Sequence, residues 1–136
     1  AVGATREVAM SKPYLHWLCD AEYTRQLTAH ELRELMPYLA RMVGMTPVGP
    51  VLLCFQDPPH PWGLSAFQPV AESHLSLHYM EPPNCAVDVF VCRSFPADVA
   101  RRILLQHFQI RESYWEQSLE RGPELAERDA IIGTHH

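Results

Sequence analysis

The sequence predicts an α+β fold, a two-layer sandwich in which helices cover one face of a mainly antiparallel sheet. Two observations support this prediction. Strand-like segments follow one another closely at residues 64–71, 73–80 and 85–92. Segments with helical periodicity stand before and after this group. Consecutive strands with separate helices favour antiparallel pairing, with the helices gathered on one side of the sheet.

The first expected elements are a strand and a helix. Residues 14–19 are rich in large side chains and predict a short strand. Residues 28–31, Thr-Ala-His-Glu, have the form of a capping box, so a helix should follow. Apolar side chains at positions 32, 35, 36, 39 and 43 then recur at the spacing of one buried helix face. Pro37 removes a backbone hydrogen bond, so we expect a kink there or a helix that begins late.

The middle of the chain is expected to supply the rest of the sheet. Residues 48–55 are a further strand candidate. The prolines within residues 57–61 predict a loop, because closely spaced prolines cannot join a sheet ladder. Residues 82–84, Pro-Pro-Asn, predict the turn between the strands at 73–80 and 85–92.

The last third of the chain predicts two helices. Residues 94–96, Ser-Phe-Pro, open the first of them. One face of this helix is marked by Ala100, Ile103, Leu104 and His107. A second and more polar helix is expected from about residue 111 to residue 125.

Composition and charge fit one compact domain. The chain has 136 residues, of which 47% are hydrophobic, and this is enough to bury one core. We expect a single domain over residues 12–132, an N-terminal arm at 1–11 and the remnant of a purification tag at 133–136. The net charge is −5, and no basic run is longer than Arg101-Arg102. A nucleic-acid partner is therefore not expected, since phosphate binding requires clustered positive charge.

The cysteines and the apolar segments bear on localisation. Four cysteines, at positions 19, 54, 85 and 92, are widely spaced and form no C-x-x-C pair. That usage fits a reducing cytosol better than a disulfide framework. No apolar stretch approaches the ~20 residues of a membrane span. We therefore expect a cytoplasmic protein without a membrane partner.

Alternation along the predicted hairpin gives its sheet two different faces. In the first strand, Leu75, Leu77 and Tyr79 share one side, and His74, Ser76 and His78 share the other. In the second strand, the valines at 87, 89 and 91 share one side, and Asp88, Phe90 and Cys92 share the other. One face should be apolar, and the other should carry the reactive groups. Cys85 lies on the valine side and is expected to be inert.

Three short motifs lie within residues 63–92. They are Gly-Leu-Ser at 63–65, Ala-Glu-Ser-His-Leu-Ser-Leu-His at 71–78 and Ala-Val-Asp-Val-Phe-Val-Cys at 86–92. This region resembles the core of the bacterial-type S-adenosylmethionine decarboxylase family. The resemblance implies that family's fold and a decarboxylase that supplies the aminopropyl donor for polyamine synthesis. It also implies a homodimer with active sites at the interface and a small-molecule substrate, S-adenosylmethionine.

The resemblance assigns roles to four residues. The chain would cut itself between Glu72 and Ser73, and Ser73 would become a pyruvoyl cofactor. Ser65 and His78 would serve this cleavage. The pyruvoyl ketone would form a Schiff base with the substrate amine and take up electrons as carbon dioxide leaves. Cys92 would then return a proton to the substrate carbon.

The resemblance weakens directly after His78. The family continues with Thr-Trp-Pro-Glu, whereas this chain has Tyr79, Met80 and Glu81. The family's tryptophan stacks on adenine and its glutamate holds the ribose, so Glu81 keeps a substrate contact and Met80 offers a softer one. Further candidate substrate contacts are Trp62 and Phe67, although such aromatic residues are more often part of a core or an interface.

These departures leave other functions open. The enzyme would decarboxylate a basic amino acid such as arginine or ornithine, or an uncleaved relative would bind S-adenosylmethionine or a similar nucleoside for another reaction or for regulation. A purely structural dimerisation domain is a third alternative. A metal site is not expected, because His74 and His78 lie roughly 13 Å apart on one strand.

Matching the apolar faces of the hairpin predicts a register. It pairs Leu75 with Val91 and Leu77 with Val89, which sets position 74 opposite 92. Ser73 would then lie diagonally from Cys92, at roughly 5–8 Å. His78 lies five residues from Ser73, roughly 16 Å along the strand. We therefore expect two protomers to stack their reactive faces, each supplying Ser65 and His78 to the partner's cleavage site.

Overall fold

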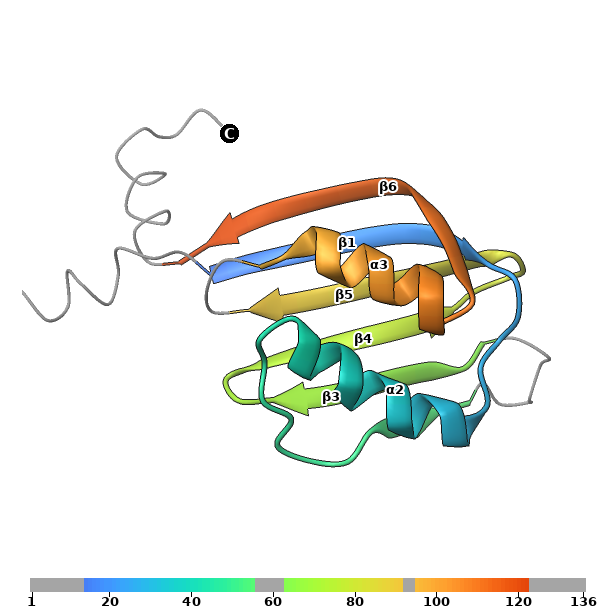
Figure 1. Ribbon diagram of the computed structural model, residues 1–136, viewed down its shortest axis with the longest axis horizontal. Helices are drawn as coiled ribbons and strands as arrows, with labels where there is room; N and C mark the ends of the chain where they lie inside the picture. Colours follow the sequence, from blue (N-terminus) through green and yellow to red (C-terminus); the bar gives the residue numbers. More distant parts are fainter. Residues whose placement is uncertain (1–13, 56–62, 92–94, 123–136) are drawn as a thin grey trace, which may run out of the picture.

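A computed structural model describes residues 14–55, 63–91 and 95–122 and confirms the α+β fold class (Figure 1). Six strands form one antiparallel sheet in the order β2-β3-β4-β5-β1-β6, and α2 and α3 lie side by side across one face of it. The elements are β1 (Tyr14–Tyr23), α2 (Ala29–Met42), β2 (Leu52–Cys54), β3 (Ser65–Val70), β4 (Ser73–Tyr79), β5 (Asn84–Val91), α3 (Ala97–His107) and β6 (Ile110–Arg121). Neither described helix has the length and apolar character needed to cross a membrane.

The capping box predicted for α2 is present and fixes where the helix begins. The Thr28 hydroxyl accepts a hydrogen bond from the Glu31 N–H at 3.1 Å, and the Glu31 carboxylate accepts one from the Thr28 N–H at 2.9 Å. Arg25 donates two further hydrogen bonds to this carboxylate. These bonds lower the pKa of Glu31 to about 2. The helix starts at this cap and continues through Pro37, so the expected late start is wrong.

The core lies between the sheet and the two helices, and it confirms the predicted apolar face. Strands β1 and β5 alternate between buried and less buried side chains, as one covered face requires, and β4 does so except at Ser76, which is buried as well. The sheet contributes Trp17, Leu75, Leu77, Val87 and Val89, and the helices contribute Leu32, Met36, Leu39, Ile103 and Leu104. Cys85 is fully buried among them, and burial raises its pKa to about 12. Its predicted position on the valine side is confirmed.

The polar helix expected over 111–125 is wrong, because β6 occupies residues 110–121. Gln109 adopts a left-handed conformation with a φ of 58°, which turns the chain back at the end of α3. The following segment then pairs antiparallel with β1 along nearly its whole length. β6 is an edge strand with one neighbour, so its side chains are largely exposed. Its polar composition reflects that exposure rather than a helix.

The strand expected over residues 48–55 is shorter than predicted. Only Leu52–Cys54 forms β2, which pairs with β3 at one edge of the sheet. Gly49 and Pro50 precede it and interrupt a regular ladder, although the Val48 N–H still donates to the Pro69 carbonyl. The loop predicted over residues 57–61 lies entirely outside the described residues.

The predicted hairpin register is wrong by two residues. Leu75 pairs with Val89, Leu77 pairs with Val87, and Phe90 stands opposite His74. A shift of two residues keeps every side chain on its face, so alternation could not reveal the error. The turn sets the register, because the Met80 N–H donates to the Asn84 carbonyl at 2.9 Å and the Asn84 N–H donates to the Glu81 carbonyl at 3.0 Å. The expected pairing of position 92 with His74 therefore fails, and Cys92 itself lies outside the described residues.

Candidate active site

The face of the sheet opposite the helices carries the candidate reactive residues. We call it the open face, since α2 and α3 both lie on the other side (Figure 1). Apart from Ser76, which is buried, its members are the less buried residues of the alternating strands. They include His16, Leu18 and Asp20 on β1, Ser65 and Phe67 on β3, His74, Ser76 and His78 on β4, and Ala86, Asp88 and Phe90 on β5.

Ser65 and His78 meet on the open face as directly paired residues of β3 and β4. The Ser65 Oγ and the His78 Nδ1 share a hydrogen bond of 2.8 Å. The ring of Phe67 contacts the imidazole edge-on, with centroids 5.3 Å apart. Both members of the pair are half-buried. Because Nδ1 is engaged, His78 has its Nε2 left for exchanging a proton with another group.

Glu72 and Ser73 lie at the opposite end of β4 from this pair. A two-residue turn joins Val70 to Ser73, and Glu72 within it has a φ of 59°, in the left-handed region that favours glycine. Ser73 is half-buried, and alternation places its side chain on the side of Leu75 rather than that of His78. Ser73 and His78 both lie on β4, as predicted. Five residues separate them, which corresponds to roughly 16 Å along the strand.

A second group of side chains gathers around Phe90 on the open face. The His74 ring stacks on it at 5.9 Å, and the His16 ring meets it edge-on at 6.1 Å. Tyr14 lies 5.6 Å away, and the Arg121 guanidinium lies over the ring at 4.8 Å. We call these five residues the Phe90 cluster. The alternation of side chains in residues 14–19 indicates that Tyr14 and His16 share one face. Arg121 could not be predicted to join them, because residues 111–125 were expected to form a helix.

The remaining candidate substrate contacts lie near the Ser65–His78 end of β4. Phe67 packs against His78, as described above. Met80 and Glu81 begin the turn after β4, where Met80 is 39% exposed and Glu81 is also exposed. The Met80 carbonyl accepts a hydrogen bond from the Tyr23 hydroxyl at 3.3 Å. Trp62 and Cys92 lie outside the described residues.

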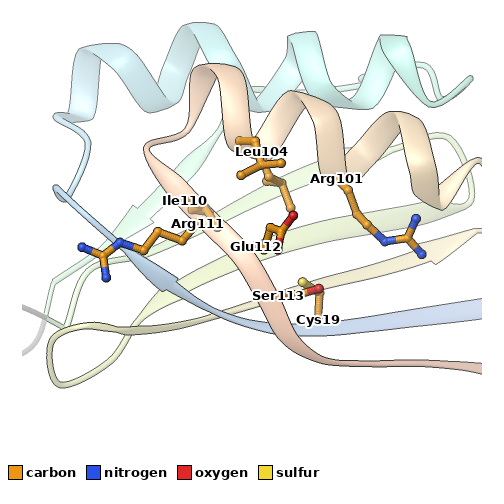
Figure 2. A pocket seen from close by; sticks show the side chains of 8 residues that line it. Cys19, Arg101, Leu104, Ile110, Arg111, Glu112 and Ser113 are labelled. Atoms are coloured by element: carbon orange, nitrogen blue, oxygen red, sulfur yellow. The ribbon is translucent and has the colours of Figure 1, made fainter.

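A cavity of about 280 Å³ lies between α3 and β6 on the helix-covered side (Figure 2). Apolar side chains such as Leu104 and Ile110 line it together with Arg101, Arg111 and Ser113. Cys19 also lines it, and burial is the main reason why the pKa of this thiol rises to about 12. The sheet separates this cavity from Ser65 and His78, so it forms no part of the candidate active site.

One comparison with known proteins found a match. A family model described as S-adenosylmethionine decarboxylase matches residues 15–122, which is more than half of the chain. No curated protein matches the sequence. The matched region runs from the start of β1 to just beyond β6 and therefore includes both ends of the candidate site.

Proposed function

The chain belongs to the S-adenosylmethionine decarboxylase family, and on that premise we propose that it decarboxylates S-adenosylmethionine with a pyruvoyl group made from its own Ser73. The observation that best supports this function is the 2.8 Å hydrogen bond between Ser65 and His78 on the open face. Such a hydroxyl–imidazole pair can move protons during self-cleavage.

The Glu72–Ser73 turn suits the first step of cleavage. The Ser73 hydroxyl attacks the Glu72 carbonyl, the C–N bond breaks, and the nitrogen takes the hydroxyl proton, so that an ester replaces the peptide bond. A base then removes the Ser73 Cα proton, the bond from Cβ to oxygen breaks, and Glu72 leaves as a carboxylate. Water converts the resulting dehydroalanine into a pyruvoyl group and ammonia. The left-handed conformation of Glu72 costs about 1–3 kcal/mol, which cutting the turn would release.

Ser73 and its surroundings fit such a group. Residue 73 is half-buried at the start of β4. Cleavage would make it the first residue of a new chain, so the strand geometry would no longer determine the direction of its side group. When formed, the pyruvoyl ketone supplies the electron sink for loss of carbon dioxide. We assign Glu81, Met80, Phe67 and Trp62 to contacts with the nucleoside and Cys92 to proton return.

The distance along β4 favours a homodimer. Ser65 and His78 cannot reach Ser73 within one chain, since roughly 16 Å separates the two ends of the strand. Two open faces stacked with their β4 strands in opposite directions would bring one protomer's pair to the partner's Glu72–Ser73 peptide, at the end of the strand where the backbone is cut. The site would then be complete only between two copies of the chain.

Intact-mass spectrometry tests cleavage. We expect the purified protein to give two fragments, residues 1–72 and 73–136, and Ser73→Ala to give one intact chain. Release of carbon dioxide from carboxyl-labelled S-adenosylmethionine should accompany the fragments. One unchanged mass after long incubation of the unsubstituted protein would contradict the proposal.

Co-expression of two variants tests the shared site. His78→Ala keeps Ser73 but loses the base, and Ser73→Ala keeps the base but loses the nucleophile. Neither variant should cut itself when expressed alone. In mixed dimers we expect the His78→Ala chain to be cut by the pair from its partner. If the mixture stays intact while the unsubstituted protein cleaves, each protomer uses its own His78.

A further inference from the structure

Asp88 places a carboxylate in the middle of the open face. It lies on β5, directly opposite Ser76 of β4 and Leu18 of β1. Its neighbours along the strand, Val87 and Val89, are buried on the helix side, so the Asp88 side chain belongs to the open face. The residue is half-buried.

Within residues 14–55, 63–91 and 95–122, this carboxylate has no ion-pair partner. The ion pairs there use Arg25, His30, Arg101 and Arg111 as the cations, on other parts of the molecule. Arg121, on the open face, lies over the Phe90 ring. A carboxylate between leucine and serine is costly once it is covered, unless a positive charge accompanies it. The dimer proposed above would cover it.

The position of Asp88 along the sheet indicates what that charge is. Its cross-strand partner Ser76 lies three residues from Ser73, roughly 10 Å, and two residues from His78, roughly 7 Å. Asp88 therefore lies on the open face toward the middle of the sheet from Ser73, the residue that would hold the substrate amine. In S-adenosylmethionine, three carbon atoms separate the amine from the sulfonium, and the adenosine lies beyond it.

We propose that Asp88 determines substrate specificity by recognising the sulfonium cation of S-adenosylmethionine. The inference rests on the proposed function, because that function fixes which end of the substrate lies at Ser73. The carboxylate would stabilise the charged sulfonium and would gain nothing from a neutral thioether of the same shape. Recognition of a charge on a half-buried face also selects against uncharged nucleosides that fit the same contacts.

The test compares two ligands in two variants. Ser73→Ala, which cannot cleave or consume ligand, is titrated by calorimetry with S-adenosylmethionine and with S-adenosylhomocysteine, the neutral thioether. We expect the sulfonium ligand to bind more tightly. Adding Asp88→Asn should reduce this preference about tenfold, equivalent to about 1.4 kcal/mol. Most of the change should come from weaker binding of the sulfonium ligand. Asp20→Asn is the matched control, since it removes a charge from the same face opposite Ala86 instead of Ser76.

Each outcome has a distinct meaning. If both ligands bind and Asp88→Asn leaves the preference unchanged, or if Asp20→Asn lowers it equally, the inference is overturned while the proposed function stands. If neither ligand binds to Ser73→Ala, the proposed function fails together with the inference. Sedimentation of Asp88→Asn supplies a further check, because dissociation of a dimer would mean that the counter-charge lies in the partner, which also overturns the inference.

Discussion

The two faces of the sheet differ in burial and polarity although the same strands build both. On the helix-covered face, Leu77 and Cys85 are almost fully buried, and the side chains pack against α2 and α3. On the open face, Ser65, His78 and Asp88 are half-buried and polar. Core residues and residues with a proposed role in the chemistry therefore alternate along one strand. Substituting neighbouring residues should separate stability from activity.

The largest expected effect comes from His78. His78→Ala removes the proposed base from the open face and should slow cleavage about 10²–10⁴-fold, with little change in melting temperature. Mass spectrometry over time and thermal unfolding measure the two quantities. His30→Ala, at an exposed position on α2 beside Glu34, is the control and should leave both unchanged. Cleavage of His78→Ala at the unsubstituted rate would remove this residue from the mechanism.

Thiol reactivity should differ between buried and exposed cysteines. Burial raises the pKa of Cys19 and of Cys85 from 9.0 to about 12. At pH 8 the reactive thiolate of each should therefore be about a thousandfold rarer than in an unperturbed thiol. Cys54 is exposed on β2 and should be alkylated before Cys19 and Cys85. Peptide mapping after iodoacetamide treatment measures the order, and rapid labelling of Cys85 in the folded protein would show that the helix-covered face opens.

Leu77 is the neighbour of His78 on the opposite face. Leu77→Ala leaves a cavity under the helices and should lower the free energy of unfolding by about 2–5 kcal/mol. Urea denaturation measures the loss. At a temperature where the variant stays folded, the bound fraction of S-adenosylmethionine should match that of the parent. A loss below 1 kcal/mol would mean that the core tolerates the cavity by collapsing around it.

The smallest expected effect concerns the turn before Ser73. In a Ser73→Ala background, Glu72→Gly should raise the free energy of unfolding by about 1 kcal/mol, because glycine adopts a positive φ without a Cβ clash. Ala71→Gly in the same turn is the control, since the backbone of Ala71 has no positive φ. With Ser73 present, Glu72→Gly should also cleave more slowly if release of this strain assists the first step. Equal stability of Glu72→Gly and its parent would show that the turn is unstrained.

Local signals predicted much of the fold. The capping box at Thr28 fixed the start of α2, because its hydrogen bonds join residues only three positions apart. Alternation identified both sheet faces, since side-chain direction repeats every two residues. The pairing partner of a strand is not local information. The hairpin register was therefore missed by two residues, and β6 was missed because pairing with β1, rather than its own sequence, makes it a strand.

For the candidate site, too, local sequence signals predicted some features, and the others depend on which strands pair. Ser65 and His78 were identified from a sequence motif, and their mutual contact follows from direct pairing of β3 with β4. Asp88 belonged to a recognised face, but its relation to Ser76 and Leu18 required the true register. The Phe90 cluster brings together residues from four strands, and Arg121 lies in a segment expected to be helical.

The strand order has a consequence for what a cut chain would do. A break between Glu72 and Ser73 would leave β1, α2, β2 and β3 on one fragment and β4, β5, α3 and β6 on the other. In the sheet, however, β1 lies between β5 and β6, and β4 lies between β3 and β5. The two fragments are therefore interlaced: β1 of the first lies between two strands of the second, and the β4–β5 pair of the second lies between two strands of the first. Cleavage would change the connectivity of the polypeptide while its pieces remain one folded body, separable by denaturant but not by dilution.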